Sequence, residues 1–198
     1  MSENFELFAY LNVGNPMVLW EIAIGRHRSV CDRSEANSHS ISLWQYGLFR
    51  QYIRHGMSPK IANEFRLEAI RQKHYPSCVS RLTGLYFFET RADAEDAIDK
   101  WNLAQSKKQF ISKINCYAAT LSRHDSEWIT HYLGKQSKND EWMHSYWSGE
   151  VYGSLPLVEV IASGVGHIED TLIRKYCYES AMEKYPLSSV MLSLGQWH

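Results

Sequence analysis

A short apolar run in the last third of the chain limits the folds that this sequence can adopt. Residues 157–163 (LVEVIAS) lie between a proline and a glycine, and their length and branched side chains are typical of one buried β-strand. The run is too short to cross a bilayer, which takes about 20 apolar residues. Residues 170–185, which follow it, have the length and the Asp start signal of a helix.

Strand and helix signals alternate irregularly along the rest of the chain. Strands are predicted at residues 5–13, 82–88 and 110–121, and helices at residues 58–73, 90–101, 126–134 and 139–149. A doubly wound parallel sheet would need a regular strand–helix alternation, so the pattern favours the α+β class. A chain of 198 residues is of the size of one domain, and we predict a single domain over residues 1–198.

Composition and charge exclude several classes of protein. With 44% hydrophobic and 22% charged residues the chain has the composition of a folded domain. Its formal net charge is -1, whereas a non-specific nucleic-acid binder usually carries a clear excess of Lys and Arg. No apolar stretch predicts a membrane span or a signal peptide. The four cysteines are widely spaced and form no CxxC pair, which predicts buried thiols in a reducing, cytoplasmic compartment.

A polar segment at residues 29–40 is the clearest predicted loop. It is rich in Ser and Asn and offers little apolar area, so we expect it to be poorly ordered without a ligand, and a lid is one use for it. The chain also lacks GxGxxG and GxxxxGK[ST], the common glycine-rich motifs that bind nucleotide phosphates. A bound nucleotide would therefore be held in another way.

Three separated blocks carry the strongest signals for a functional site. They are residues 7–14 (LFAYLNVG), residues 76–90 (PSCVSRLTGLYFFET), and residues 146–150 (YWSGE) continuing into 156–164 (PLVEVIASG). Their content and order resemble the ADP-ribosyltransferase-like superfamily, in particular its uncharacterised bacterial and phage members. The resemblance implies split mixed or antiparallel sheets with flanking helices. It also implies transfer of ADP-ribose from NAD to a macromolecular target, either a protein or a nucleic acid, with release of nicotinamide.

The resemblance also implies roles for individual residues. Glu159, in the third block, takes the place of the catalytic glutamate, and Ser80 that of the serine beside it. Tyr86 or Phe88 takes the place of the aromatic ring that stacks on nicotinamide. The first block has neither the Arg nor the His that the family carries early in the chain. Tyr10 or Asn12 would replace it.

Elementary chemistry supports some of these roles and gives each one a competing structural interpretation. A carboxylate stabilises the oxocarbenium-like transition state of glycosidic cleavage, and Glu159 stands among apolar neighbours, where carboxylates are rarely buried without a partner. If the strand simply alternates, however, Glu159 faces solvent. Ser80 is either a site residue or a cap, and Arg81 binds either a phosphate of NAD or a neighbouring carboxylate. Phe87 is predicted to be core.

The third block leaves further alternatives open. Tyr146 and Trp147 either wall the cleft or pack a helix that ends at Gly149, and Glu150 offers a second carboxylate. The histidines show no metal-binding spacing such as HExxH, so no zinc site is predicted. Two other functions remain: a catalytically inactive module of the same fold that binds NAD or nucleic acid, which the missing early Arg or His favours, and an unrelated effector or toxin-like nuclease that uses the histidines.

Overall fold

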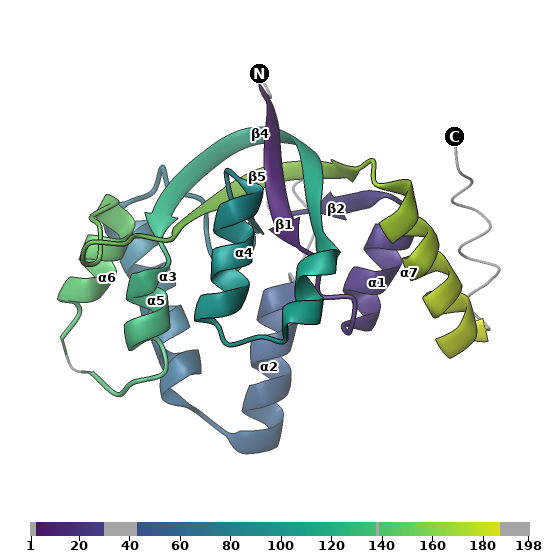
Figure 1. Ribbon diagram of the computed structural model, residues 1–198. Coiled ribbons are helices and arrows are strands. Elements are labelled where there is room, and N and C mark those ends of the chain that lie inside the picture. Colours follow the sequence, from purple (N-terminus) through teal and green to yellow (C-terminus); the bar gives the residue numbers. More distant parts are fainter. Residues whose placement is uncertain (1–2, 30–42, 138, 187–198) are drawn as a thin grey trace.

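The computed structural model describes residues 3–29, 43–137 and 139–186, in which a curved antiparallel sheet arches over the helices (Figure 1). This arrangement confirms the α+β class. The strands of the sheet are β1 (Glu3–Tyr10), β2 (Arg26–Arg28), β3 (Leu85–Phe87), β4 (Ile111–Asp125) and β5 (Val158–Ile168). They follow the order β1-β4-β5-β2, and β3 also pairs with β5. The strands predicted near the N-terminus and at residues 110–121 and 157–163 are confirmed, whereas the strand predicted at residues 82–88 is reduced to its last part.

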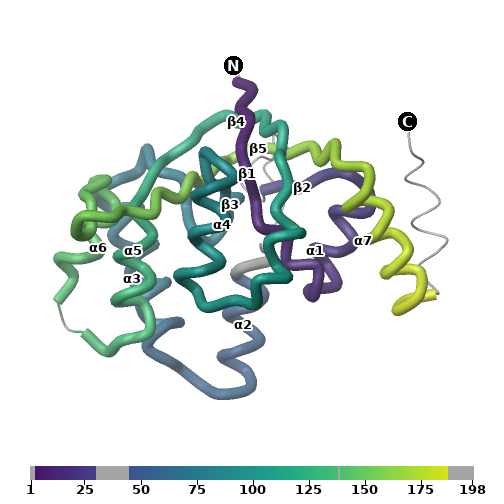
Figure 2. The backbone as a smooth tube through the Cα atoms, in the orientation of Figure 1, coloured from purple at the N-terminus to yellow at the C-terminus, as the bar shows by residue number. Residues whose placement is uncertain are grey.

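Strong curvature of β4 and β5 brings distant segments together (Figure 2). The short strands β2 and β3 lie one after the other along the same edge of β5. β1 pairs with the opposite edge of β4, yet Phe8 of β1 also exchanges two backbone hydrogen bonds with Phe88, of 2.8 and 2.7 Å, just after β3. The sheet therefore curls until its first strand meets the end of β3.

The pairing of β4 with β5 shifts register between Ala118 and Thr120. Gly164 of β5 lies opposite Ala118 and allows the two strands to approach closely there. A Cβ atom at position 164 would overlap the carbonyl oxygen of Tyr117. We expect Gly164→Ala to lower the free energy of unfolding by about 1–3 kcal/mol or more, measured by urea denaturation, because backbone atoms cannot move aside cheaply. Gly47→Ala is the matched control: a Cβ at that helical position meets no atom within 4 Å. It should stabilise the protein by about 0.5–1 kcal/mol. Equal effects of the two changes would contradict the prediction.

The helices that were predicted from cap residues are confirmed. Ser58 caps the N-terminus of α3, Thr90 and Asp93 form a capping box on α4, and Asp170 caps α7. Two helices were not predicted, α1 and α2. The bounds are α1 (Pro16–Ala23), α2 (Leu43–His55), α3 (Pro59–His74), α4 (Arg91–Lys100), α5 (Glu127–Tyr132), α6 (Glu141–Ser148) and α7 (Thr171–Lys184), with a 3-10 helix at Gln105–Phe110.

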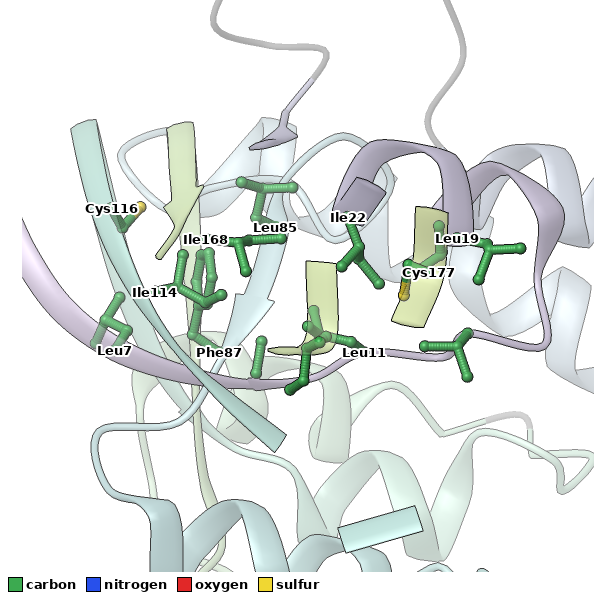
Figure 3. Close-up of a cluster of buried hydrophobic side chains, with 14 of the residues drawn as sticks. Leu7, Leu11, Leu19, Ile22, Leu85, Phe87, Ile114, Cys116, Ile168 and Cys177 are labelled. Carbon is green, nitrogen blue, oxygen red and sulfur yellow. The ribbon is translucent and has the colours of Figure 1, made fainter. Parts of the chain in front are cut away.

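The main hydrophobic core lies between the sheet and the helix pair α1 and α7 (Figure 3). Leu19 and Ile22 of α1 and Cys177 of α7 pack there with Phe87 of β3, which is fully buried as predicted. Cys116 and Cys177 are buried free thiols, as expected, whereas Cys78 is only half-buried. A second core, rich in aromatic rings, joins α3, α5 and α6. The end of β5 that carries Glu159 is thus flanked by α3 and α6.

The loop predicted at residues 29–40 lies outside the described residues except for Ser29, which is buried and hydrogen-bonded to the backbone of Gly164. In the described ranges, no helix combines the length and the apolar character that a membrane crossing would require.

Candidate functional site

A buried ionic cluster joins α3, the turn before β3, α6 and β5. Its four members are Glu64, Arg81, Tyr146 and Glu159, and we call it the Arg81 cluster. The guanidinium of Arg81 bonds both carboxylates: Nη1 donates to Glu159 Oε1 at 2.6 Å, while Nε and Nη2 donate to the two oxygens of Glu64 at 3.3 and 3.2 Å. Tyr146 completes the cluster, since its hydroxyl donates to Glu159 Oε1 at 2.7 Å and accepts from Arg81 Nη1 at 3.0 Å.

A tight turn at residues 80–84 places Arg81 in this position. The amide of Gly84 donates to the carbonyl of Ser80 at 2.9 Å, and a Cβ on Gly84 would be 2.5 Å from a methyl group of Ile161, so only glycine fits there. Tyr86 holds the turn from β3, because its hydroxyl donates to the Arg81 carbonyl at 2.5 Å. The Arg81 guanidinium also lies over the rings of Tyr86 and Tyr146, at 5.3 and 5.4 Å from their centroids.

The Arg81 cluster has one cationic group and two carboxyl groups in surroundings nearly free of solvent. Burial raises the pKa of Glu159 above its usual value, although the charge of Arg81 and the hydrogen bond from Tyr146 oppose the shift. Burial acts to lower the pKa of Arg81, but the negative charges of Glu64 and Glu159 hold that pKa well above the usual range. Arg81 therefore stays charged, and with both carboxyls ionised the cluster carries an excess negative charge.

The two oxygens of the Glu159 carboxylate differ in their contacts. Oε1 accepts from both Arg81 and Tyr146. Of the hydrogen bonds made among the residues that the structure describes, none ends on Oε2. The carboxylate is thus fixed in orientation through one oxygen and keeps acceptor capacity on the other. The competing interpretation, in which the strand alternates and Glu159 faces solvent, is wrong, because the residue is only 5% exposed.

A second polar group lies on the other side of the turn. Ser80 Oγ donates to Glu68 Oε2 at 2.7 Å, and Arg71 also bonds Glu68. Burial of Glu68 acts to raise its pKa, but the hydrogen bonds from Arg71 and Ser80 outweigh burial and lower it. Ser80 therefore bonds Glu68 and caps the turn, and the groups that orient Glu159 are Arg81 and Tyr146.

The other predicted site residues are spread over several parts of the fold. Tyr86 is half-buried beside Arg81. Phe88 is buried in a core under α4, against which Tyr10 packs, and Asn12 is exposed after β1. Trp147 is buried among α3, α5 and α6, where its indole N–H donates to the Leu67 carbonyl at 2.9 Å. Of the predicted residues, the structure brings together Glu159, Arg81, Tyr146 and Tyr86.

Sequence reasoning missed two residues of this region. Glu64 looked like an ordinary helical glutamate, but it is fully buried and binds Arg81. His124, opposite Glu159 on β4, bonds the Tyr146 carbonyl through Nδ1 at 2.9 Å, and burial lowers its pKa to about 4. Because a carbonyl only accepts, Nδ1 carries the proton, and Nε2 is a buried acceptor to which none of the described residues donates a hydrogen bond. The sequence did indicate that Glu64 could be buried, because it lies three residues from both Ile61 and Leu67 and therefore on the same apolar face of the helix.

Tyr146→Phe tests whether the hydroxyl stabilises the cluster. The change keeps the buried ring but leaves Glu159 without one donor and Arg81 without one acceptor, so we expect the free energy of unfolding to fall by about 1.5–3 kcal/mol in urea denaturation. Tyr176→Phe, at an exposed position on α7, is the control and should change stability by less than about 0.5 kcal/mol. A loss no greater than that of the control would show that the hydroxyl adds nothing.

The site lies within the part of the chain that comparison with known proteins recognises. In the described residues, no group of three His, Cys, Asp or Glu side chains is arranged to hold a metal ion. No curated protein matches the chain significantly. The family model described as "Protein of unknown function (DUF2441)" matches residues 27–171, which include every member of the Arg81 cluster and make up well over half of the sequence. The chain belongs to the DUF2441 family.

Proposed function

We propose that this protein has an ADP-ribosyltransferase-like fold, binds NAD and transfers ADP-ribose to a macromolecular target, with Glu159 as the catalytic carboxylate. The observation that carries the proposal is the state of Glu159, whose Oε1 is fixed by Arg81 and Tyr146 while Oε2 accepts no hydrogen bond from the described residues. A carboxylate held in this way is preorganised to accept a hydrogen bond from a ribose hydroxyl.

The charge of the Arg81 cluster suits the proposed reaction. Cleavage of the bond between ribose and nicotinamide develops positive charge on the ribose, as in other glycosidic cleavages. Two carboxylates face a single guanidinium in the cluster, so its excess negative charge would stabilise that cation in surroundings of low dielectric constant. Arg81 also limits the cost of keeping Glu159 ionised.

The arrangement of the sequence blocks gives further support. Residues of the second and third blocks meet at one place, because β3 pairs with β5 and Tyr86 lies opposite Ile161, two residues beyond Glu159. The half-buried ring of Tyr86 offers the stacking surface that nicotinamide needs.

A second candidate function is a module of the same fold that binds NAD or nucleic acid without catalysis. Two observations favour it: Glu159 is only 5% exposed, and the early Arg or His of the superfamily is absent from the first block. In this case the ion pair between Arg81 and Glu159 would serve the stability of the fold alone.

One assay separates the two functions. The purified protein is incubated with NAD labelled in its adenylate part, nicotinamide release is followed by chromatography, and label transfer is sought on protein and on nucleic acid in a cell extract. Nicotinamide release with label on a macromolecule is the expected result. Binding of NAD, measured by calorimetry, without nicotinamide release would favour the inactive module, and the absence of both would overturn the proposal.

A further inference from the structure

His124 of β4 contacts both the backbone and the ring of Tyr146. Its Nδ1–H donates to the Tyr146 carbonyl at 2.9 Å, and the centroids of the two rings are 4.7 Å apart, with 32° between the ring planes. The imidazole also packs edge-on against Trp147, with the ring centroids 4.9 Å apart. These contacts fix the orientation of the imidazole, and they hold Tyr146 in the last turn of α6.

His124 is linked to Glu159 through Tyr146. The two residues lie directly opposite each other on β4 and β5, so their side chains project from the same face of the sheet. Tyr146 contacts both of them, because its carbonyl and ring meet His124 while its hydroxyl donates to Glu159 Oε1 at 2.7 Å. A displacement of the Tyr146 side chain would therefore change the position of the Glu159 carboxylate.

The stability of the fold gives no reason for a histidine at this position. His124 Nε2 is buried and accepts no hydrogen bond from the described residues, and a buried acceptor without a donor destabilises the folded state. The Tyr146 carbonyl does not depend on His124, because the amide of Gly149 also donates to it at 3.2 Å. A buried polar group that costs stability is the kind of local exception expected at a functional site.

The imidazole supplies its contacts without adding a charge. Burial lowers the pKa of His124 to about 4, and although the bond to the Tyr146 carbonyl opposes this shift, the charge of Arg81 adds to it. His124 is therefore neutral at pH 7. A Lys or Arg at this position could also donate to the carbonyl, but it would bring a second cation opposite Glu159. The excess negative charge of the Arg81 cluster would then be lost.

We propose that His124 is a positioning residue for the reaction proposed above: it holds Tyr146 in place and, through the Tyr146 hydroxyl, the Glu159 carboxylate. This inference rests on the proposed function, in which Glu159 meets the ribose. A misplacement of about 1 Å in a reacting group can cost about 100-fold in rate. Because His124 acts through Tyr146, its replacement should lower kcat and leave the KM for NAD nearly unchanged.

Two substitutions at this position test the proposal. His124→Phe keeps a buried ring but has neither nitrogen. His124→Asn keeps a donor, because its amide nitrogen is as many bonds from Cα as Nδ1 is. Nicotinamide release is measured over a range of NAD concentrations, and the melting temperature by circular dichroism. If His124→Phe does not fold, His124→Leu, which also lacks both nitrogens, takes its place.

The expected result separates activity from stability. His124→Phe should lower kcat by about 10-fold or more with KM within about 2-fold of the wild type, while its melting temperature stays the same or rises because the unpaired acceptor is gone. His124→Asn should recover most of kcat although its smaller side chain lowers the melting temperature. A purely structural role would give the opposite order. His167→Phe, at an exposed position on β5, is the matched control and should leave kcat unchanged.

Failure of this inference can be told from failure of the proposed function. An unchanged kcat in His124→Phe, or a loss that His124→Asn does not reverse, would overturn the inference alone. A wild type that releases no nicotinamide would overturn the proposed function, and NMR titration of the Glu159 carboxyl carbon would then decide the inference. The hydrogen bond from Tyr146 lowers the pKa of Glu159, so that pKa should rise in His124→Phe. An equal pKa in the wild type and the variant would contradict the link.

Discussion

Arg81→Met should lower the free energy of unfolding by about 3–5 kcal/mol at pH 7. The change leaves Glu64 and Glu159 buried without the cation that both of them bind, and an uncompensated buried charge is among the most destabilising features of a protein. Methionine has nearly the length of the arginine stem, so the loss would come from charge more than from a cavity. Urea denaturation of the variant and the wild type measures the difference.

The pH dependence of this loss has a definite sign. Burial already raises the pKa of Glu159, and removal of Arg81 takes away the largest influence that lowers it. Since the folded variant then binds a proton at Glu159 more tightly than the unfolded chain does, this proton favours folding at low pH, and its benefit is lost as the pH rises through the raised pKa. The difference between Arg81→Met and the wild type should therefore shrink when the pH is lowered from 7 to 5. A difference that does not change with pH would contradict this account.

Two control variants identify the cause of the loss. Arg123→Met removes an arginine whose ion pair with Glu89 is exposed to solvent, and it should cost less than about 1 kcal/mol. Adding Glu64→Gln and Glu159→Gln to Arg81→Met removes the two buried charges, so part of the lost stability should return. If the triple variant is less stable than Arg81→Met alone, the cluster is held by the shape of its side chains and not by its charge balance.

Local signals in the sequence predicted most of the fold. Ser58 before Pro59, Thr90 three residues before Asp93, and Asp170 gave helix starts that the structure confirms, because each of these side chains bonds a free backbone N–H at its helix end. The strand at residues 157–163 was predicted for a different reason: it consists mainly of branched apolar residues, and Pro156 and Gly164 bound it. Patterns of this kind depend on residues that are close together in the chain, so they can be recognised in a single sequence.

Two helices were missed where local signals pointed elsewhere. Asn and Pro are typical turn residues, and Asn15 and Pro16 closely follow the strand predicted at residues 5–13, but the Asn15 side chain accepts from the Met17 amide and starts α1. α2 follows a segment rich in serine and exposes several aromatic side chains, so its apolar pattern did not indicate a buried face. In the second block, residues 82–84 were predicted as the start of the strand, but Gly84 forms a tight turn under Ile161.

The candidate site was only partly predictable because it depends on long-range contacts. Arg81 and Glu159 are 78 residues apart, and Arg81 and Glu64 are 17 apart, so no spacing rule links them. The sequence did indicate that Glu159 needs a partner among its apolar neighbours, and that Arg81 would bind either a carboxylate or a phosphate. The structure shows the carboxylate. Which residues contact each other across the fold could be known only after β5, α3 and α6 had been placed.

Glu159→Gln should reduce the rate of nicotinamide release by about 100-fold or more if the proposed function is correct. Glutamine keeps the size of the side chain and an oxygen that accepts from Arg81 and Tyr146, but it carries no charge to stabilise a cationic ribose. NAD affinity, measured by calorimetry, should change little. The fold should also survive, because Arg81 remains paired with Glu64 and the cluster loses its excess negative charge.

Glu150→Gln is the matched control for this variant. Glu150 lies just beyond α6 with its side chain exposed, and the same loss of charge there should leave the rate unchanged. A large fall in Glu150→Gln with none in Glu159→Gln would move the catalytic role to the other carboxylate of the third block. An unchanged rate in Glu159→Gln beside an active wild type would end the assignment of Glu159, and the ion pair with Arg81 would then be a purely structural one, as it is in the inactive module.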